Sequence, residues 1–283
     1  MEPARDLPNW QPPNADSLRT ARRLLRPWTL LTSPVFLNSD RVPRDRPVMF
    51  IVNHTLMGMV DTPLLMLGVQ EHTGHFPRSM ADHFHFTVPG WRDILRRYGA
   101  VEGTRDNCRA LLREKHSMMI FPGGGREVFK RRGEAYKLLW GKRAGFALLA
   151  REFAYTIVPV ASVGAEECYR ILLDADDIAR LPLGKQLLAK APRHDVSFPT
   201  LVSGLFGTPL PRPQRFYFSF GHPIESAPYK DRTDNDEAVF ELREEVRVAL
   251  EAEISALLAY REQDPDRPLS RRLPSILKEL RAP

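Results

Sequence analysis

The stretch VMFIVNHTLMGMVDTPLL, residues 48–65, joins an apolar run of strand length to a polar turn and then to the beginning of a helix. Residues 48–52 are apolar without alternation, which is typical of a strand buried on both faces of a parallel sheet. Asp61 is followed by Thr62 and Pro63, and this order is typical of a helix N-cap with proline in the first turn. The stretch therefore predicts a strand, a turn and a helix of an α/β sheet.

Apolar runs of strand length alternate with amphipathic runs of helical length as far as about residue 225. Strands are predicted at 48–52, 118–121, 157–161 and 216–220. Helices are predicted near 61–70, 105–115 and 136–153, with a long one at 235–261. We therefore expect an α/β fold, with a mixed and largely parallel sheet covered by helices, in one domain that spans residues 39–262.

The two ends of the chain differ from this pattern. Residues 1–38 predict a flexible, proline-rich arm followed by a basic amphipathic helix that ends near Pro27. At helical spacing the apolar stripe holds Leu18, Ala21, Leu25 and Trp28, and the basic stripe holds Arg19, Arg22, Arg23 and Arg26. Two interpretations stay open: the helix packs on its own domain, or it lies in an anionic membrane interface with Trp28 near the headgroups. Residues 263–283 predict a basic, proline-containing tail.

The composition is that of an ordinary globular protein, with 43% hydrophobic and 27% charged residues, which excludes collagen-like, coiled-coil and wholly disordered chains. The net charge of +6 favours anionic partners such as an acidic membrane surface, and no nucleic-acid-binding pattern accompanies it. Cys108 and Cys168 lack a disulfide or redox spacing and are predicted to be reduced interior thiols. Because no apolar run of about 20 residues and no signal peptide is visible, we expect a cytoplasmic protein, peripheral on the inner face of the membrane.

The first candidate for chemistry is His54, which follows the first buried strand at the carboxyl edge of the predicted sheet. Asp61 lies seven positions later, and a carboxylate that accepts the second N–H of an imidazole stabilises the imidazolium. His54 could then remove a proton from an alcohol. Since the chain has no GxSxG nucleophile motif, that hydroxyl is expected to belong to a substrate.

The second candidate is the loop FPGGGRE, residues 121–127, which directly follows the strand predicted at 118–121. Its glycines allow a ligand to approach the backbone closely, and an arginine suits a phosphate or a carbonyl oxygen. The loop is not a Walker A motif. A third segment, residues 99–105, ends in Arg105, which is either a ligand contact or a solvated residue in the first turn of a helix capped by Thr104.

Together these motifs resemble the glycerolipid and phospholipid acyltransferase superfamily over about residues 48–165. The residues that carry the resemblance are His54 with Asp61, Gly99 to Arg105, Phe121 to Glu127, and Val158-Pro159-Val160. The resemblance implies transfer of a fatty acyl group from acyl-CoA or acyl carrier protein to a lipid hydroxyl, with no metal or other cofactor.

The resemblance also implies a role for each matching residue. His54 is the expected general base and Asp61 its orienting carboxylate. Arg105 is expected to assist on the acceptor side. The acceptor or the oxyanion is expected to contact the loop residues Gly123, Gly124, Gly125, Arg126 and Glu127.

Two departures from the superfamily pattern bear on the mechanism and the acceptor. Six residues separate His54 from Asp61 where four are usual, so the pair meets only if the intervening chain is a loop, since a regular helix would place them about 10 Å apart. Gly124 stands where phosphatidate-forming members usually carry Glu. The FPGGxRE form resembles the branch with diacylglycerol acyltransferase-like and phytyl ester synthase-like members, which slightly favours a neutral acceptor, diacylglycerol or a long-chain alcohol, over lysophosphatidate.

Two other classes of function stay open. A metal-dependent hydrolase is suggested by a cluster of potential ligands within fourteen positions: His72, His75, Asp82, His83 and His85. A non-catalytic protein that binds a lipid surface or CoA is suggested by the altered spacing of His54 and Asp61.

Overall fold

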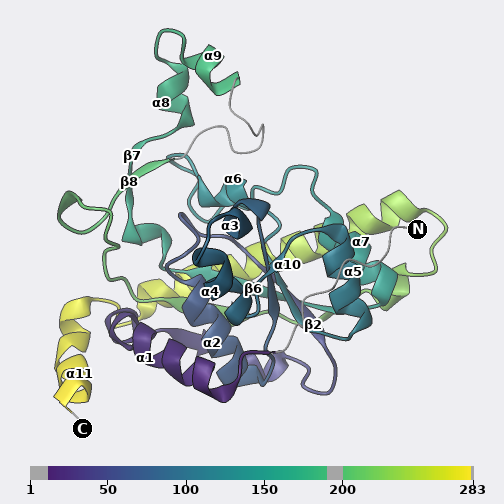
Figure 1. Cartoon of the computed structure of the whole chain (residues 1–283), viewed down its shortest axis with the longest axis horizontal. Helices are drawn as coiled ribbons and strands as arrows, with labels where there is room; N and C mark the ends of the chain where they lie inside the picture. Colours follow the sequence, from purple (N-terminus) through teal and green to yellow (C-terminus); the bar gives the residue numbers. More distant parts are fainter. Residues whose placement is uncertain (1–11, 190–199, 282–283) are drawn as a thin grey trace.

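In the computed structural model, which describes residues 12–189 and 200–281, a central sheet is covered by helices on both faces (Figure 1). Its strands run in the order β1-β9-β6-β2-β5-β3-β4, and β10 pairs with β6. Their bounds are β1 (Val35–Leu37), β2 (Val48–Val52), β3 (Arg78–Ala81), β4 (Val101–Glu102), β5 (Met118–Ile120), β6 (Thr156–Val163), β9 (Tyr217–Phe220) and β10 (Ile224–Glu225).

The pairing directions confirm the expected mixed and largely parallel sheet. β2 lies parallel between β5 and β6, with Phe50 opposite Met119 and Val158. The pairs β3–β5, β3–β4 and β1–β9 are parallel as well. β6 pairs antiparallel with β9 and β10.

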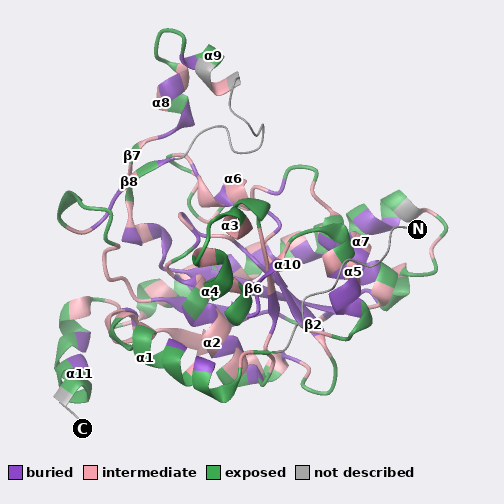
Figure 2. Ribbon diagram, viewed as in Figure 1, coloured by how far each residue is buried: buried purple, intermediate pink, exposed green. Residues whose placement is uncertain are grey.

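The buried strand β2 contributes side chains to two hydrophobic cores. Because side chains alternate along a strand, Met49 and Ile51 pack with helices α5 (Arg105–Arg113), α7 (Gly145–Phe153) and α10 (Asn235–Gln263). The side chains of Val48, Phe50 and Val52 lie in the other core, with helices α1 (Ala15–Thr32) and α2 (Thr62–Thr73). Buried residues accordingly gather along the strands and the inner sides of the helices (Figure 2). The uninterrupted apolar run of β2 is thus explained by burial on both faces.

Two predicted helices have different bounds in the structure. The helix predicted at 136–153 begins only at Gly145, since Tyr136 and Gly141 adopt positive φ angles that interrupt a helix. The N-terminal helix continues through Pro27 to Thr32.

The apolar stripe of α1 faces the domain itself. Leu25 and Trp28 pack against the core, and the indole Nε1 of Trp28 donates to the Val60 carbonyl at 2.8 Å. Of the two interpretations of this helix, the structure therefore shows the first: its apolar side packs on its own domain. Leu24 lies on the exposed side, and contact of that side with a membrane stays a prediction.

Most of the C-terminal segment predicted as a tail forms helix α11 (Leu269–Arg281). Its Arg272 is buried and donates to the Leu31 carbonyl at 2.6 Å, which ties the end of the chain to α1. Residues 1–11, predicted as part of a flexible arm, and residues 282–283 lie outside the described residues. Among the described helices, none combines the length and the apolar character needed to cross a bilayer.

Between β6 and β9 the chain leaves the sheet in an excursion that the sequence did not predict. We call residues 170–210 the arm; its helices α8 and α9 project from the body of the molecule at the top of Figure 1. It contains β7 (Arg170–Leu173), α8 (Ala175–Ala179), α9 (Gly184–Ala189), β8 (Leu201–Ser203) and η3 (Leu205–Gly207), and its residues 190–199 lie outside the described residues. The remaining short elements of the fold are η1 (Ser39–Arg41), α3 (His83–Thr87), α4 (Trp91–Arg97), α6 (Gly125–Val128), η2 (Glu166–Cys168) and η4 (Ala227–Tyr229).

Candidate active site

The backbone of His54 is held on both sides by buried charged side chains. Its N–H donates to Glu127 Oε2 at 2.7 Å, and its carbonyl accepts from Lys130 Nζ at 2.8 Å. Glu127 and Lys130 are both almost fully buried. Since β2 ends at Val52, these bonds fix the position of His54 at the carboxyl edge of the sheet, where the sequence placed it.

The imidazole of His54 stacks on the ring of Phe121, with ring centroids 4.3 Å apart. Gly58, at φ +58°, also lies against the imidazole, because a Cβ atom there would come within 2.2 Å of His54 Cε1. Only glycine therefore permits this position of the ring. The Nδ1 atom is buried and has no hydrogen-bond partner among the described residues, so it is available to a group that enters the site.

Burial keeps this imidazole neutral. Desolvation, together with the positive charge of Lys130 and a smaller effect of His85, lowers the pKa of His54 from 6.5 to about 3. A neutral imidazole is the form that can accept a proton.

We predict that the Cε1 proton resonance of His54 shows no titration between about pH 8 and about pH 5. The unfolded chain binds a proton at His54 near pH 6.5, whereas the folded chain binds it only near pH 3. Protonation of His54 therefore leaves the free energy of unfolding unchanged above pH 6.5 and lowers it as the pH falls from 6.5 toward 3. NMR of the folded protein measures the resonance directly. A titration midpoint between about 6 and 7 would contradict the prediction.

Asp61 makes different contacts from those predicted. Its Oδ1 accepts from the Thr55 hydroxyl at 2.9 Å and its Oδ2 from the Ser162 hydroxyl at 2.6 Å. Its side chain does not cap α2, and the structure shows no hydrogen bond between it and His54 among the described residues. Burial raises the pKa of Asp61, and the two hydroxyl bonds partly oppose that shift.

The chain between His54 and Asp61 is a loop, since Met57 and Gly58 have positive φ angles. A loop of this kind is what allows His54 and Asp61 to come together although six residues separate them. The orienting role of Asp61 stays a prediction, and the structure places Thr55 and Ser162 as its present partners.

Glu127 of the FPGGGRE loop faces the interior. Its Oε1 accepts from the Leu139 N–H at 2.8 Å while Oε2 accepts from His54, so both carboxylate oxygens bind backbone. A Cβ atom at Gly123 would come within 2.0 Å of its Cδ, which explains glycine there. The sequence predicted that Glu127 binds substrate, and the structure instead gives it contacts that position His54.

We predict that Glu127→Gln lowers the free energy of unfolding by about 1–3 kcal/mol, because the new amide NH₂ must face one of two buried N–H donors. Chemical denaturation at neutral pH measures the change. The exposed Glu114→Gln is the control, with an expected change within about 0.5 kcal/mol. Equal stability of the two variants would contradict the positioning role of Glu127.

The other residues of the loop have contacts and backbone angles of their own. Arg126 forms an ion pair with Glu134 through Nη2, whereas its Nη1 is buried without a hydrogen-bond partner among the described residues. Gly124 has φ +49°, and Gly125 begins α6. The unpartnered Nη1 suits a substrate oxygen, as the sequence predicted for Arg126.

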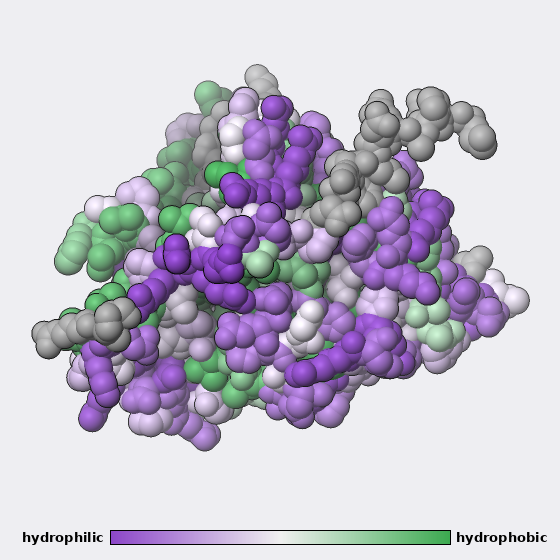
Figure 3. Space-filling view, turned by 60° about the horizontal axis from the view of Figure 1, so that its bottom comes forward, coloured by the Kyte–Doolittle hydropathy of each residue, from purple (hydrophilic) through white to green (hydrophobic). Residues whose placement is uncertain are grey.

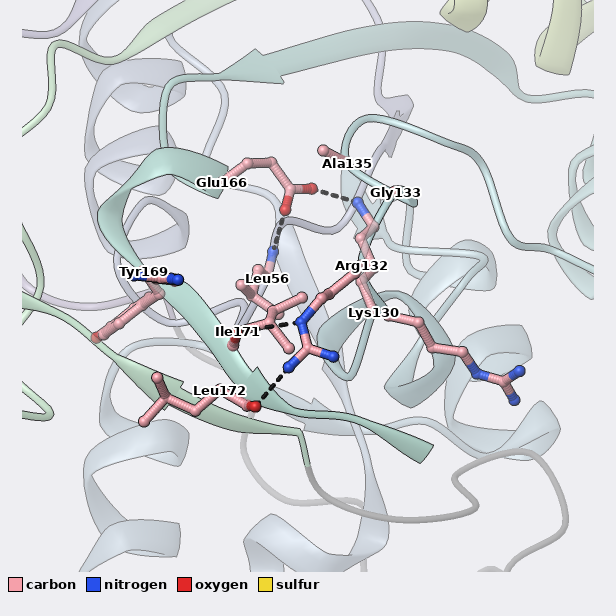
Figure 4. A pocket seen from close by; sticks show the side chains of 11 residues that line it. Leu56, Lys130, Arg132, Gly133, Ala135, Glu166, Tyr169, Ile171 and Leu172 are labelled. Carbon is pink, nitrogen blue, oxygen red and sulfur yellow. Dashed lines mark hydrogen bonds and ion pairs between the residues drawn. The ribbon is translucent and has the colours of Figure 1, made fainter. Parts of the chain in front are cut away.

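Sequence reasoning missed a buried ion pair beneath this loop. Lys130 is buried and pairs with Glu166, which also accepts from the Leu56 N–H at 3.3 Å. Beside this pair lies a cavity of about 420 Å³, whose walls include Leu56, Lys130 and Tyr169 (Figure 4). The chain around Lys130 is not helical, so the spacing of basic residues gave no signal of burial.

Arg105 is exposed in the first turn of α5, whose N-cap is Thr104, and it makes no hydrogen bond or ion pair with any described residue. Of the two alternatives for Arg105, the structure thus shows a solvated residue in the first turn of a helix. Its role in acceptor binding stays a prediction.

The histidines that suggested a metal site have separate partners. His75 binds the Pro43 carbonyl and the Ser117 hydroxyl, and His83 pairs with Glu102. The ring of His72 lies against that of Phe36, tilted by 30°. His85 accepts from Trp91, and Asp82 caps α3. Within the described ranges no three His, Cys, Asp or Glu side chains are grouped to hold a metal ion. Both cysteines are buried and free, and burial raises the pKa of Cys108 to about 11.

The segment that carries the site matches a family model. Residues 34–163 match the family model described as Acyltransferase, and they include His54, Asp61 and the FPGGGRE loop. Over these residues the chain is similar to the acyltransferase family.

Similar proteins match larger parts of the chain. It is 30% identical over 251 residues to phytyl ester synthase 1, chloroplastic, of Arabidopsis thaliana, covering 82% of this chain and 35% of that protein. It is 31% identical over 172 residues to the DGAT1/2-independent enzyme synthesizing storage lipids of Homo sapiens, covering 61% of this chain and 52% of that protein. The chain thus spans about a third to a half of the length of these relatives.

The chain also matches a solved structure. The crystal structure of the 1-acyl-sn-glycerophosphate (LPA) acyltransferase PlsC from Thermotoga maritima matches with a TM-score of 0.49 and 17% sequence identity. The match covers 83% of this chain and 78% of that chain.

Proposed function

We propose that this acyltransferase moves a fatty acyl group from acyl-CoA or acyl carrier protein to a lipid hydroxyl, with His54 as the general base. The observation that carries the proposal is the imidazole of His54, whose backbone is held by Glu127 and Lys130 and whose ring stacks on Phe121 of the FPGGGRE loop, inside the segment that matches the acyltransferase model. The hydroxyl of the acceptor gives its proton to the imidazole, and its oxygen forms a bond to the thioester carbonyl carbon. The C–S bond then breaks, and the imidazolium returns the proton to the departing thiolate, so that the products are the ester and the free thiol of the donor.

Arg126 and the glycine backbone are the proposed contacts of the oxyanion or the acceptor. The Nη1 atom of Arg126 has no hydrogen-bond partner among the described residues, and a donor aimed at developing negative charge stabilises a transition state. Asp61 is proposed to act on His54 once a substrate is bound, when the imidazolium needs a negative charge nearby.

A neutral acceptor, diacylglycerol or a long-chain alcohol, is proposed ahead of lysophosphatidate. Gly124 supports this choice, as do the names of two similar proteins, a phytyl ester synthase and an enzyme synthesizing storage lipids. Such acceptors reside in membranes, so we propose that the protein works peripherally at an anionic membrane surface on its cytoplasmic side. The net charge of +6 supports an anionic surface.

A protein that binds lipid or CoA without turnover is the alternative, and the engagement of Asp61 with Thr55 and Ser162 favours it. Release of free CoA from a long-chain acyl-CoA separates the two functions, measured with diacylglycerol, a fatty alcohol and lysophosphatidate in turn. Release that requires one acceptor establishes acyl transfer and identifies that acceptor. No release with any acceptor, and none with an acyl carrier protein donor, would leave the binding function.

A further inference from the structure

The arm exposes large apolar side chains to solvent. Phe206 is 93% exposed and Leu183 is 72% exposed, and four further leucines of the arm are exposed as well, namely Leu172, Leu181, Leu201 and Leu210. The face of the molecule in Figure 3 is largely hydrophilic, with apolar side chains gathered in separate patches. Concentrated exposure of this kind marks an interaction surface.

Backbone geometry places the two most exposed of these side chains at turns. Leu183 lies between α8 and α9 with φ +62°, and Phe206 lies within η3 with φ +53°. Bulky side chains rarely adopt this left-handed conformation. Both turns point away from the sheet (Figure 1), so neither side chain contributes to the core.

Positive charge accompanies the apolar side chains. Arg170 at the base of the arm and Lys185 in α9 are exposed, and neither has an ion-pair partner among the described residues. Arg131 and Arg132, by contrast, pair with Asp176 and Asp177 of α8. Apolar side chains beside unpaired cations are complementary to an anionic lipid bilayer.

The base of the arm is tied to the loop that holds His54. Arg132 donates to the carbonyls of Ile171 and Leu172 (Figure 4), and the Thr200 hydroxyl donates to the Lys130 carbonyl at 3.0 Å. Lys130 in turn binds the carbonyl of His54. Ile171 and Leu172 also form a wall of the cavity of about 420 Å³ that Leu56 and Lys130 line.

We propose that the arm inserts Leu183 and Phe206 into an anionic bilayer and thereby holds this cavity and the loop of His54 at the membrane surface. The inference rests on the proposed function in one respect, since a lipid acceptor must reach His54 from a membrane. It also assigns membrane contact to the arm in place of the apolar stripe of α1, which is packed on the core.

The test compares the binding of three proteins to vesicles of equal parts phosphatidylglycerol and phosphatidylcholine. Burial of one such side chain changes a partition coefficient by roughly 10- to 100-fold, so we expect the double variant Leu183→Ser with Phe206→Ser to bind at least about tenfold more weakly than wild type. Leu24→Ser is the matched control, because Leu24 is 74% exposed on α1. It should bind as wild type does.

Since the substituted side chains are exposed, all three proteins should unfold at the same temperature. The inference is overturned if Leu24→Ser alone weakens binding, if the double variant binds as tightly as wild type, or if wild type does not bind these vesicles. Binding needs no turnover, so His54→Ala should bind like wild type. A failure of membrane insertion is thereby distinguished from a failure of acyl transfer.

Discussion

The His54→Ala variant is expected to lose acyl transfer by at least about 10²-fold, because general acid–base catalysis contributes roughly 10²–10⁴-fold. No other described side chain replaces the imidazole, since Glu127 and Lys130 are engaged with its backbone on the interior side. Those bonds do not involve the ring, so the loop should keep its position in the variant. Release of free CoA with a saturating acceptor measures the loss.

His83→Ala is the matched control for this experiment, because it removes an imidazole that is exposed on α3 and pairs with Glu102. It should retain the activity of wild type. If His54→Ala has the same turnover as His83→Ala, His54 is not the base and the mechanism is wrong. Thermal unfolding of both variants separates a loss of chemistry from a loss of fold.

The strands and the position of His54 could be predicted from the sequence because both depend on local patterns. β2 was predicted with the bounds that the structure shows, since burial on both faces requires an uninterrupted apolar run. The end of that strand then placed His54 at the edge of the sheet. Local patterns also predicted the long helix α10, whose buried residues recur at helical spacing.

Features that depend on distant contacts could not be predicted in the same way. Lys130 and Glu166 are 36 positions apart, and only the tertiary fold reveals that they form a buried pair. The side of α1 that packs on the domain is decided by the contacts of Trp28 with Val60 and Phe216. The amphipathic pattern of the helix does not predict these contacts, because Val60 and Phe216 are distant in the sequence. The arm escaped prediction because its strands are short and its exposed leucines follow no period.

The buried ion pair gives the largest expected effect on stability. Lys130→Met removes the cation that neutralises Glu166 and the donor to the His54 carbonyl, and loss of one partner of a buried pair typically costs about 3–5 kcal/mol. Lys130 opposes the effect of burial on Glu166, which by itself raises the pKa of that carboxyl. Without Lys130 this pKa should rise further, and chemical denaturation at neutral pH measures the resulting loss of stability.

A second variant separates stability from catalysis. In the double variant Lys130→Met with Glu166→Gln no buried charge is left unpaired, and the glutamine oxygen can still accept from the Leu56 N–H, so part of the stability should return. The His54 carbonyl nevertheless stays without its donor, because Met cannot replace Lys130 Nζ. If Lys130 positions the base, kcat therefore stays low in the double variant while KM changes little. Recovery of kcat in proportion to stability would instead show that Lys130 only stabilises the fold.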